Sequence, residues 1–495
     1  MRTYRSAALV AATFLLTAGA GLAAPAAYAG TPGGTHASDR NSDFDGDGYE
    51  DVLVGAPGAT VGGKKGAGYV TAQYGGPAGM GTRRVAVITQ STTGVPGAPE
   101  AGDGFGRALA TGDLDADGYD DAVVGIPGED IGTVADAGGV TVLWGSPRGL
   151  TGAGGDWLEA AEPTAGKRFG AALAAARFSA DTPGDELAVA DREDLALYVY
   201  DSAPQQRSAP PRRTAPDRTA AAAQRRILPR SLTTGDYDDN GYADLVVSGV
   251  TTGDEPGHGW SALFSGRAGG LAYARDLRGG PVATSGDIDH DGYDDLVTGE
   301  PNGPDDGGET MTGGLVGVYR GSPDGPLGAD GADGPPQWWT QDTPGVPGTA
   351  ERGDGWGTDL SVEDTDGDGY ADVAIGAPGE DIGTVADAGA VWVLRGTADG
   401  LTATGARSWD QNSAQVPGTA EKGDRWGGQV RLTDPNRDGR HGLLASAPGE
   451  NTGDGVVWVL PAGPGGITAT GSWTYGGGSL NAPSSDAAYG AAIDE

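Results

Sequence analysis

The chain contains no cysteine and only four histidines among its 495 residues. The lack of cysteine excludes disulfide bonds, thiolate metal sites and a cysteine nucleophile. The G-x-S-x-G, H-E-x-x-H and P-loop patterns are also missing from the sequence, and with them the common signatures of serine hydrolases, zinc peptidases and nucleotide-binding enzymes. We therefore expect a protein without enzymatic activity.

Long apolar runs are scarce as well. After residue 29, no run approaches the roughly 18 apolar residues that a membrane-spanning helix needs. The first 29 residues have the features of a secretory signal peptide: Arg2 and Arg5 precede an apolar stretch over 7–16, and Ala27-Tyr28-Ala29 forms a small-x-small cleavage site. A retained membrane anchor is the alternative. We expect 1–29 to be removed, 30–42 to be a linker, and the mature chain to be a secreted, extracellular monomer without a transmembrane segment.

Basic residues are few, with 32 lysines and arginines against 69 aspartates and glutamates, and the formal net charge is -37. Such a surface repels phosphate backbones, so nucleic acid is excluded as a partner. Seven arginines lie within residues 201–230, a segment that is also rich in proline and alanine. We expect this segment to be a solvated, largely disordered insertion. A role in binding an anionic polymer is the alternative.

Aspartate, by contrast, is abundant and regularly placed. A nine-residue loop, D-x-D-x-[DN]-G-Y-x-D, occurs five times, with side-chain oxygens at positions 1, 3, 5 and 9 and a glycine at position 6 that permits a sharp bend. Ca2+ takes six to eight oxygen ligands, which these side chains and the tyrosine carbonyl at position 7 can largely supply. Solvated acidic turns are the alternative reading. The predicted calcium ligands are Asp43, Asp45, Asp47, Tyr49 and Asp51; Asp113, Asp115, Asp117, Tyr119 and Asp121; Asp236, Asp238, Asn240, Tyr242 and Asp244; Asp287, Asp289, Asp291, Tyr293 and Asp295; and Asp364, Asp366, Asp368, Tyr370 and Asp372.

The acidic loop belongs to a longer repeat of about 65 residues, of which two further copies are damaged. An aromatic-Gly pair such as Phe105-Gly106 stands eight residues before the loop, and a buried run ending in Gly-x-Pro follows it. Short alternating apolar runs such as 140–144 and 391–394, together with 93 glycines, indicate many short strands separated by turns.

Four strands in each of seven repeats predict an all-β fold, a seven-bladed β-propeller of four-stranded antiparallel blades. The first loop lacks a preceding aromatic-Gly strand, whereas Tyr489-Gly490 near the end of the chain has no loop after it. We expect the C-terminal strand, about 487–493, to complete the first blade and close the ring. The alternative is a frayed tail.

The ordered succession of aromatic-Gly, the acidic loop and Gly-Ala-Pro over residues 43–495 resembles the FG-GAP repeats of the integrin alpha-subunit N-terminal propeller. The resemblance implies calcium in hairpins on a lower face and ligand-binding loops on the opposite, upper face. We expect the calcium to be structural, because several weak sites together can match the stability of a domain.

Four departures from this pattern are visible. The third copy has Arg177, Ser179, Asp181 and Asp185, and its arginine predicts no metal there; the seventh has Asp434, Asn436, Asp438 and Gly442, which predicts an empty or weak site. Leu228-Pro229 and Gly279-Gly280 replace aromatic-Gly, so atypical inner strands are expected in blades 4 and 5. Nothing resembles the leg domains or the membrane helix of an animal integrin.

Several other motifs are open to two readings. The peptide at 128–138 recurs at 379–389, and is either a binding surface or a turn kept by duplication. Arg352-Gly353-Asp354 matches an adhesion tripeptide, but its Gly-Asp belongs to the repeat, so we expect no adhesive role. Tryptophans on strands are expected to pack between blades, with an exposed sugar platform as the alternative: Trp144, Trp338, Trp339, Trp392, Trp458 and Trp473.

The functional hypothesis is a non-catalytic adhesion or binding scaffold that resembles an integrin alpha head, with a protein or glycan ligand on its upper face. The alternative is a carbohydrate-binding propeller or a calcium-assisted polysaccharide-degrading enzyme. The identity of the ligand does not follow from the residues, because a fold does not specify function.

Overall fold

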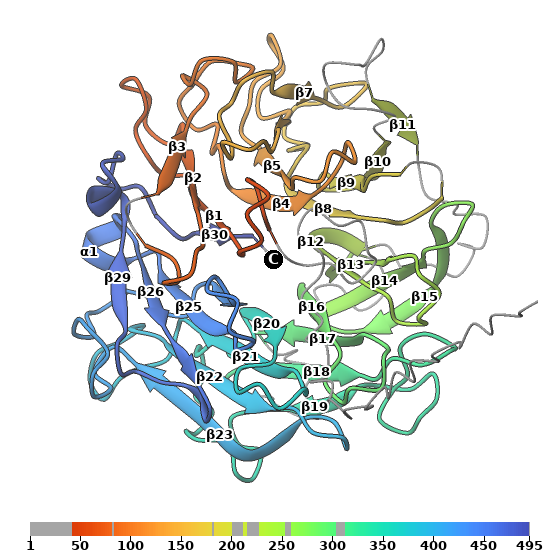
Figure 1. Ribbon diagram of the computed structural model, residues 1–495, viewed down its shortest axis with the longest axis vertical. Coiled ribbons are helices and arrows are strands. Elements are labelled where there is room, and N and C mark those ends of the chain that lie inside the picture. The colour runs from red at the N-terminus through yellow and green to blue at the C-terminus, as the bar shows by residue number, and fades with distance from the viewer. Residues whose placement is uncertain are drawn as a thin grey trace, which may run out of the picture.

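Seven four-stranded antiparallel sheets surround a central axis in the computed structural model (Figure 1). The structure describes residues 42–81, 84–180, 183–199, 211–214, 227–252, 259–302 and 312–494. The predicted signal peptide, residues 30–41 of the predicted linker, and Asp181 lie outside these residues. Among the described residues, no helix combines the length and the apolar character needed to cross a bilayer.

Each sheet is one blade, and the strands of a blade follow one another from the axis outward, except in blade 1. Blade 1 consists of β30 (Ala492–Ile493), β1 (Val52–Ala56), β2 (Tyr69–Gln73) and β3 (Val85–Ile88); blade 2 of β4 (Ala108–Gly112), β5 (Asp121–Ile126), β6 (Gly139–Leu143) and β7 (Asp156–Leu158); blade 3 of β8 (Ala172–Ala176), β9 (Glu186–Ala190), β10 (Leu195–Val199) and β11 (Arg212–Thr214); and blade 4 of β12 (Ile227–Gly235), β13 (Asp244–Thr251), β14 (Gly259–Ser265) and β15 (Ala272–Arg278).

The remaining blades have the same order. Blade 5 consists of β16 (Val282–Gly286), β17 (Asp295–Glu300), β18 (Leu315–Tyr319) and β19 (Gln337–Trp339); blade 6 of β20 (Asp359–Glu363), β21 (Asp372–Ala377), β22 (Ala390–Arg395) and β23 (Thr402–Asp410); and blade 7 of β24 (Val430–Thr433), β25 (Gly442–Ala447), β26 (Val456–Leu460) and β29 (Trp473–Tyr475). Blade 7 has three additional short elements: a hairpin of β27 (Ala462–Gly463) and β28 (Gly466–Ile467), the helix α1 (Glu450–Gly453) and the 3-10 helix η2 (Gly477–Leu480).

The two ends of the described chain meet in blade 1. Strand β30 pairs antiparallel with β1, with Ile493 opposite Val54, and the C-terminus lies close to the ring axis (Figure 1). The hydroxyl of Tyr489 hydrogen-bonds the hydroxyl of Thr71 at 2.6 Å, and the amide of Gly490 donates to the carbonyl of Gly55 at 2.9 Å. The predicted closure of the ring by the C-terminal strand is therefore confirmed.

The apolar core consists of seven clusters, one at each interface between neighbouring blades. A single blade cannot cover its own two faces, and the middle strands β1, β5 and β21 are buried along their whole length. The aromatic residues of the aromatic-Gly pairs fill these interfaces, each at most 2% exposed: Phe105, Phe169, Trp356, Trp426 and Tyr489. Four of the six strand tryptophans are buried as predicted (Trp144, Trp339, Trp392, Trp458), while Trp338 and Trp473 are partly exposed.

Glycines from adjacent blades touch at the same interfaces, which explains two of the sequence motifs. A Cβ atom on Gly125, the glycine of Gly-x-Pro in blade 2, would lie 2.2 Å from the carbonyl oxygen of Gly170 in blade 3. The same contact, at 2.0–2.2 Å, recurs for Gly55 with Gly106, Gly299 with Gly357, and Gly376 with Gly427. The repeat therefore needs glycine at these sites so that backbones can approach closely.

Two predictions about the irregular region need correction or extension. Residues 212–214, expected inside a disordered insertion, form β11 and pair with β10. The sequence did not indicate this strand because an outermost strand has a free edge and needs no apolar pattern, and Arg212 and Arg213 are exposed. The expected irregularity of blade 4 is confirmed, since β12 has nine residues and shifts register between Pro229 and Ser231, where the proline cannot donate to the ladder.

Candidate metal centres

All five acidic loops lie at one end of the propeller, which we name the lower end. Four of them connect the innermost strand of a blade to its second strand, as the loop at Asp113 connects β4 to β5. The loop at Asp43 occupies the same place in blade 1, where β30 supplies the innermost strand. The structure therefore places every predicted ligand set in an equivalent position.

The first aspartate of each loop organises the bend. It accepts a hydrogen bond from the amide of the glycine at position 6, with N–O distances of 2.8–3.1 Å. This glycine has a positive φ in every loop, 86° at Gly48 and 90° at Gly118, for example, which a residue with a side chain rarely adopts. The backbone at position 4 is also left-handed, including at Ala116 and His290. The sequence did not indicate this conformation because no single residue type occupies position 4 in all five loops.

Position 5 tightens the same bend. Its side-chain oxygen accepts a hydrogen bond from the amide of the tyrosine at position 7, at 2.9–3.2 Å, in all five loops. The tyrosine amide thus has a defined role, while the predicted binding of metal by the tyrosine carbonyl stays a prediction.

The ninth position does more than the sequence indicated. One oxygen of this aspartate accepts a hydrogen bond from a glycine amide just after the third strand, at 2.8–3.0 Å, in all five blades: Asp51 from Gly75, Asp121 from Gly145, Asp244 from Gly266, Asp295 from Gly321 and Asp372 from Gly396. In four loops the other oxygen accepts from the amide at position 2. This residue therefore clamps the loop to the third strand. In the loops of Asp51, Asp121 and Asp295 each oxygen keeps a second lone pair for a cation, whereas Oδ2 of Asp372 also accepts from the hydroxyl of Thr365 and from Arg395.

Four of the five loops bring three carboxylates together, each offering an oxygen within 4.8 Å of the others. The groups are Asp43, Asp45 and Asp51; Asp113, Asp115 and Asp121; Asp287, Asp289 and Asp291; and Asp364, Asp366 and Asp368. The loop at Asp236 forms no such group within the described part of the chain. Its Asn240 occupies position 5, and the amide nitrogen of that side chain donates to the carbonyl of Gly266 at 3.1 Å.

Burial makes the charged form of these carboxyls unfavourable. Burial raises the pKa of Asp51, Asp244 and Asp295 to about 8, and nearby carboxylates of the same loop add to the rise. Burial likewise raises the pKa of Asp113 and Asp236 to about 6. Like charges this close destabilise one another unless a proton or a cation intervenes.

Three arginines that the sequence analysis missed supply part of that positive charge. Arg84 forms ion pairs with Asp45 and Asp47, and Arg395 forms ion pairs with Asp366 and Asp372. The guanidinium of Arg320 lies 3.5 Å from Asp289. Arg320 and Arg395 stand at the end of the third strand of their blade, whereas Arg84 directly precedes the fourth strand, β3. An arginine at the end of the third strand is therefore a signal that could have found two of the three.

The residues present fit a hard divalent cation. The carboxylates of each group offer only oxygen, the donor type that Ca2+ and Mg2+ prefer. In the loop at Asp287, Oδ1 of Asp289 is buried and accepts no hydrogen bond among the described residues. Several loops can therefore hold a metal ion.

The third loop has a different register from the predicted one. Strand pairing places Glu186 opposite Ala176, the position that Asp121 takes opposite Gly112 in blade 2, so the loop has one extra residue. Asp185 instead accepts a hydrogen bond from the amide of Asp113 at 3.1 Å. The guanidinium of Arg177 lies over the ring of Tyr242 in the next blade.

Position 8 links neighbouring blades, a role that the sequence analysis also missed. Asp120 of blade 2 accepts a hydrogen bond from the amide of Asp43 at 2.7 Å, and Asp294 does the same for Asp236 at 2.8 Å. In the seventh loop, His441 at position 8 contacts the carbonyl of Asp364 through Nδ1 at 2.9 Å. Asp434 still binds the amide of Gly439 at 2.7 Å, so the damaged seventh loop keeps the fold of an intact one.

The adhesion-like tripeptide is not presented to a partner through its acidic group. Asp354 is 2% exposed and accepts a hydrogen bond from the amide of Glu351 at 2.6 Å. The carboxylate is therefore part of the connection between blades 5 and 6.

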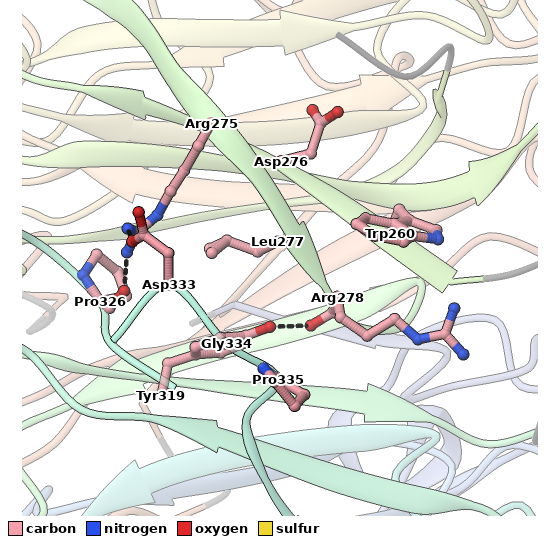
Figure 2. Close-up of a pocket in the computed structure, with 10 residues that line it drawn as sticks. All are labelled: Trp260, Arg275, Asp276, Leu277, Arg278, Tyr319, Pro326, Asp333, Gly334 and Pro335. Carbon is pink, nitrogen blue, oxygen red and sulfur yellow. Dashed lines mark hydrogen bonds and ion pairs between the residues drawn. The ribbon is translucent and has the colours of Figure 1, made fainter. Parts of the chain in front are cut away.

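A cavity of about 340 Å³ lies between the outer strands of blades 4 and 5 (Figure 2). Trp260 and Tyr319 line it together with Arg275, Asp276 and Arg278. The guanidinium of Arg278 lies 5.6 Å from the ring centre of Trp260, and Arg275 forms an ion pair with Asp333 at the opposite side. The cavity thus combines aromatic surface with charged hydrogen-bonding groups.

Comparison with known proteins identifies FG-GAP repeats over residues 40–72, 105–143, 279–314 and 356–394. No curated protein matches the chain. Solved structures with a similar arrangement include a triple arginine-to-alanine mutant of AofleA from Arthrobotrys oligospora (10% identity, 74% of this chain and 86% of that chain, TM-score 0.37), Sqt1 of Chaetomium thermophilum (13%, 71% and 68%, TM-score 0.40), and an asparagine-to-glutamine mutant of the Aleuria aurantia lectin in complex with alpha-methyl-L-fucoside (10%, 74% and 93%, TM-score 0.35). The four matched repeats and the seven-bladed architecture of the chain fit an FG-GAP β-propeller family.

Proposed function

We propose that this protein is a secreted, calcium-binding propeller that acts as a non-catalytic binding scaffold, with its ligand on the upper end, opposite the acidic loops. The ligand is a protein or a glycan. Calcium at the lower end has a structural role, because it neutralises carboxylates that hold the first, second and third strands of a blade together.

One observation carries the calcium assignment: four loops each gather three carboxylates within 4.8 Å of one another. Extracellular modules bind Ca2+ with dissociation constants near 0.1 to 1 mM. At ten times that constant each site adds about 1.4 kcal/mol, so five sites add about 7 kcal/mol, comparable to the stability of a whole domain. Calcium removal should therefore weaken the entire ring rather than one loop.

The scaffold role rests on the architecture and on the resemblance to integrin alpha propellers. A closed ring is rigid and leaves only short, protected strand edges, while loops at the end opposite the metal centres are free to vary. Secretion rests on the expected signal peptide at residues 1–29, and it places the loops in surroundings where calcium is available. The loop aspartates are occupied by backbone amides and by one another, which makes them poor general bases.

Two measurements test the proposal. The melting temperature is measured in calcium and in chelator for the wild type, for Asp113→Asn, and for the control Asp130→Asn, whose side chain is exposed. We expect calcium to raise the melting temperature of the wild type and of the control by many degrees, and of Asp113→Asn by less. Identical curves with and without chelator would contradict the calcium assignment, and calcium-independent ligand capture would contradict its role in holding the binding surface.

A second candidate function is carbohydrate binding, and the cavity between blades 4 and 5 favours it (Figure 2). Its volume of about 340 Å³ lies within the range of small-molecule sites, and a tryptophan beside arginine and aspartate side chains can stack on and hydrogen-bond a sugar. We expect Trp260→Leu to abolish binding on a glycan array, whereas Trp338→Leu, a partly exposed tryptophan outside the cavity, should not. Equal glycan binding by both variants contradicts this site.

A further inference from the structure

Three junctions at the upper end hold the same set of polar side chains. In each, a glutamine follows the outermost strand of one blade, an aspartate lies in the connection to the next blade, and a glutamate follows the second strand of that next blade. The sets are Gln90, Asp103 and Glu129 between blades 1 and 2; Gln341, Asp354 and Glu380 between blades 5 and 6; and Gln411, Asp424 and Glu450 between blades 6 and 7.

The geometry of the three sets is the same. The side-chain amide of the glutamine donates a hydrogen bond to the glutamate at 2.9, 2.9 and 2.7 Å. The backbone carbonyl of the aspartate accepts a hydrogen bond from the glycine just before the glutamate at 2.9, 2.8 and 3.1 Å. Each set therefore joins two blades through both side chains and backbone.

The glutamine in each set has an unused acceptor. The side-chain oxygens of Gln90, Gln341 and Gln411 are buried and accept no hydrogen bond among the described residues, and the residues are 4%, 1% and 1% exposed. Each oxygen belongs to the amide group that contacts the glutamate. Burying an amide oxygen without a partner is unfavourable, and a threefold repetition indicates that something absent from the chain itself meets it.

The two carboxyls of each set also lack an ion-pair partner in the described part of the chain; Lys64 attracts Asp103 but forms no ion pair with it. Among the described residues, none of the six forms an ion pair with lysine or arginine. Each junction therefore has a surplus of acceptors and of negative charge.

The junction between blades 2 and 3 shows how the chain compensates this charge when it can. Lys167 stands two residues before Phe169, where Asp103 stands two residues before Phe105. The carbonyl of Lys167 accepts a hydrogen bond from the amide of Arg192 at 3.0 Å, as the carbonyl of Asp103 accepts one from the amide of Gly128. Arg192 is therefore equivalent to Gly128, and the residue after it, Glu193, is equivalent to Glu129. Lys167 and Glu193 form an ion pair. An ammonium group thus accompanies the glutamate where the aspartate is missing.

The junction between blades 7 and 1 shows the complementary case. The carbonyl of Ala487 accepts the equivalent hydrogen bond from the amide of Gly58 at 3.0 Å. Ala487 therefore takes the position of the aspartate, and Ala59, the residue after Gly58, takes the position of the glutamate. Both positions are fully buried alanines, so the aspartate and the glutamate are lost together. The substitutions at these junctions preserve charge balance, which a purely steric role would not require.

We propose that the three junctions with Gln, Asp and Glu each bind a hard cation of the calcium class, and that these upper-end sites are separate from the acidic loops. The two carboxylates and the glutamine oxygen supply oxygen donors only, as such cations prefer. The cation takes the place that the ammonium of Lys167 takes in the neighbouring junction. A proton shared between the two carboxyls is the competing explanation, but it leaves the glutamine oxygen without a partner.

The experiment counts bound ions. Calcium bound per chain is measured by equilibrium dialysis and atomic emission for the wild type and for the triple variant Asp103→Asn, Asp354→Asn, Asp424→Asn. Asparagine can still accept the backbone hydrogen bond that each aspartate accepts, for example from Glu351. We expect three fewer ions per chain. The control, Asp324→Asn, Asp399→Asn, Glu162→Gln, makes the same change in charge at exposed side chains outside the three junctions and should bind as many ions as the wild type.

A second variant and a second measurement cover the case in which the first variant does not fold. The triple substitution Asp103→Lys, Asp354→Lys, Asp424→Lys copies the junction of Lys167, and should also lose three ions while melting at a higher temperature than the wild type in chelator. Anomalous scattering from wild-type crystals soaked in terbium should show a peak at each junction. An unchanged ion count in a folded variant, or no peak at the junctions, overturns the proposal. Because the count is a difference, this result does not depend on whether the acidic loops bind calcium.

Discussion

Arg431 of blade 7 forms an ion pair with Asp494, the residue that follows the strand completing blade 1. Their side chains are 4% and 0% exposed. Asp494 also accepts hydrogen bonds from the amide of Leu53 at 2.8 Å and from the hydroxyl of Ser42 at 2.9 Å. One buried carboxylate thus joins both ends of the described chain to the last blade.

Replacing the arginine should weaken the closed ring. Arg431→Met leaves the carboxylate of Asp494 buried without its cation, and breaking a buried pair from one side costs about 3–5 kcal/mol. The exposed Arg148→Met should change stability by less than about 0.5 kcal/mol. Denaturant unfolding in calcium measures both. Equal stability of the two variants would mean that the ring does not depend on this contact.

His441 joins three blades near the same closure and should make stability depend on alkaline pH. Although burial alone lowers its pKa, Glu363 and Glu50 raise it to about 10, and Nε2 lies 3.6 Å from a carboxylate oxygen of each glutamate. A folded-state pKa above the unfolded value stabilises the protein fully below about 6.5, and this stabilisation is lost as the pH rises through about 10.

The matched comparison is with His441→Gln. In calcium, the difference in unfolding free energy between wild type and variant should be a few kcal/mol near pH 6 and should shrink toward pH 10. A difference that stays constant over this range would show that His441 is not charged in the folded protein.

The regular parts of this propeller follow from the sequence because each is carried by side-chain type and spacing. The blade number, the acidic loops and the closure through Tyr489-Gly490 all rest on motifs of that kind. Contacts between segments far apart in the sequence do not, because they depend on which loops meet in space. Arg84 and Asp45 within blade 1, and Gln90 and Glu129 across blades 1 and 2, are separated by many residues, and neither pair has a local pattern.

The register of the third acidic loop was predicted wrongly for a different reason. One inserted residue places Glu186, not Asp185, at the start of its second strand, and both residues are acidic. Spacing alone cannot separate two adjacent carboxylates when a loop changes length. The strand register resolves them because Glu186 pairs with Ala176.

Glycine contacts between blades predict a position-specific effect of alanine. Gly125→Ala would place a methyl group 2.2 Å from the carbonyl of Gly170, so neighbouring backbones must move apart, which costs about 1–3 kcal/mol. Gly76→Ala, where nothing lies within 4 Å and φ is not positive, should be close to neutral. Thermal melting of the two variants in calcium distinguishes them. A neutral Gly125→Ala would indicate that the blades can separate without loss.

The acidic loops should reverse the pH dependence of stability when calcium is removed. In the metal-free protein, burial raises the pKa of Asp51, Asp244 and Asp295 to about 8 from an ordinary value of 3.8. Between these values the folded state holds protons that the unfolded state has released. Stability from these groups is therefore complete below about pH 4 and is lost as the pH rises through about 8.

Calcium changes the sign because it binds the ionised carboxylates. Raising the pH removes competing protons, so the stabilisation by calcium should grow from pH 5 to pH 8, while the melting temperature in chelator falls over the same range. Melting curves at fixed free calcium and in chelator, taken across this range, measure both trends. The variant Asp51→Asn should flatten the fall in chelator, since asparagine has no proton to lose. Parallel profiles with and without calcium would place the raised pKa values and the metal in different parts of the molecule.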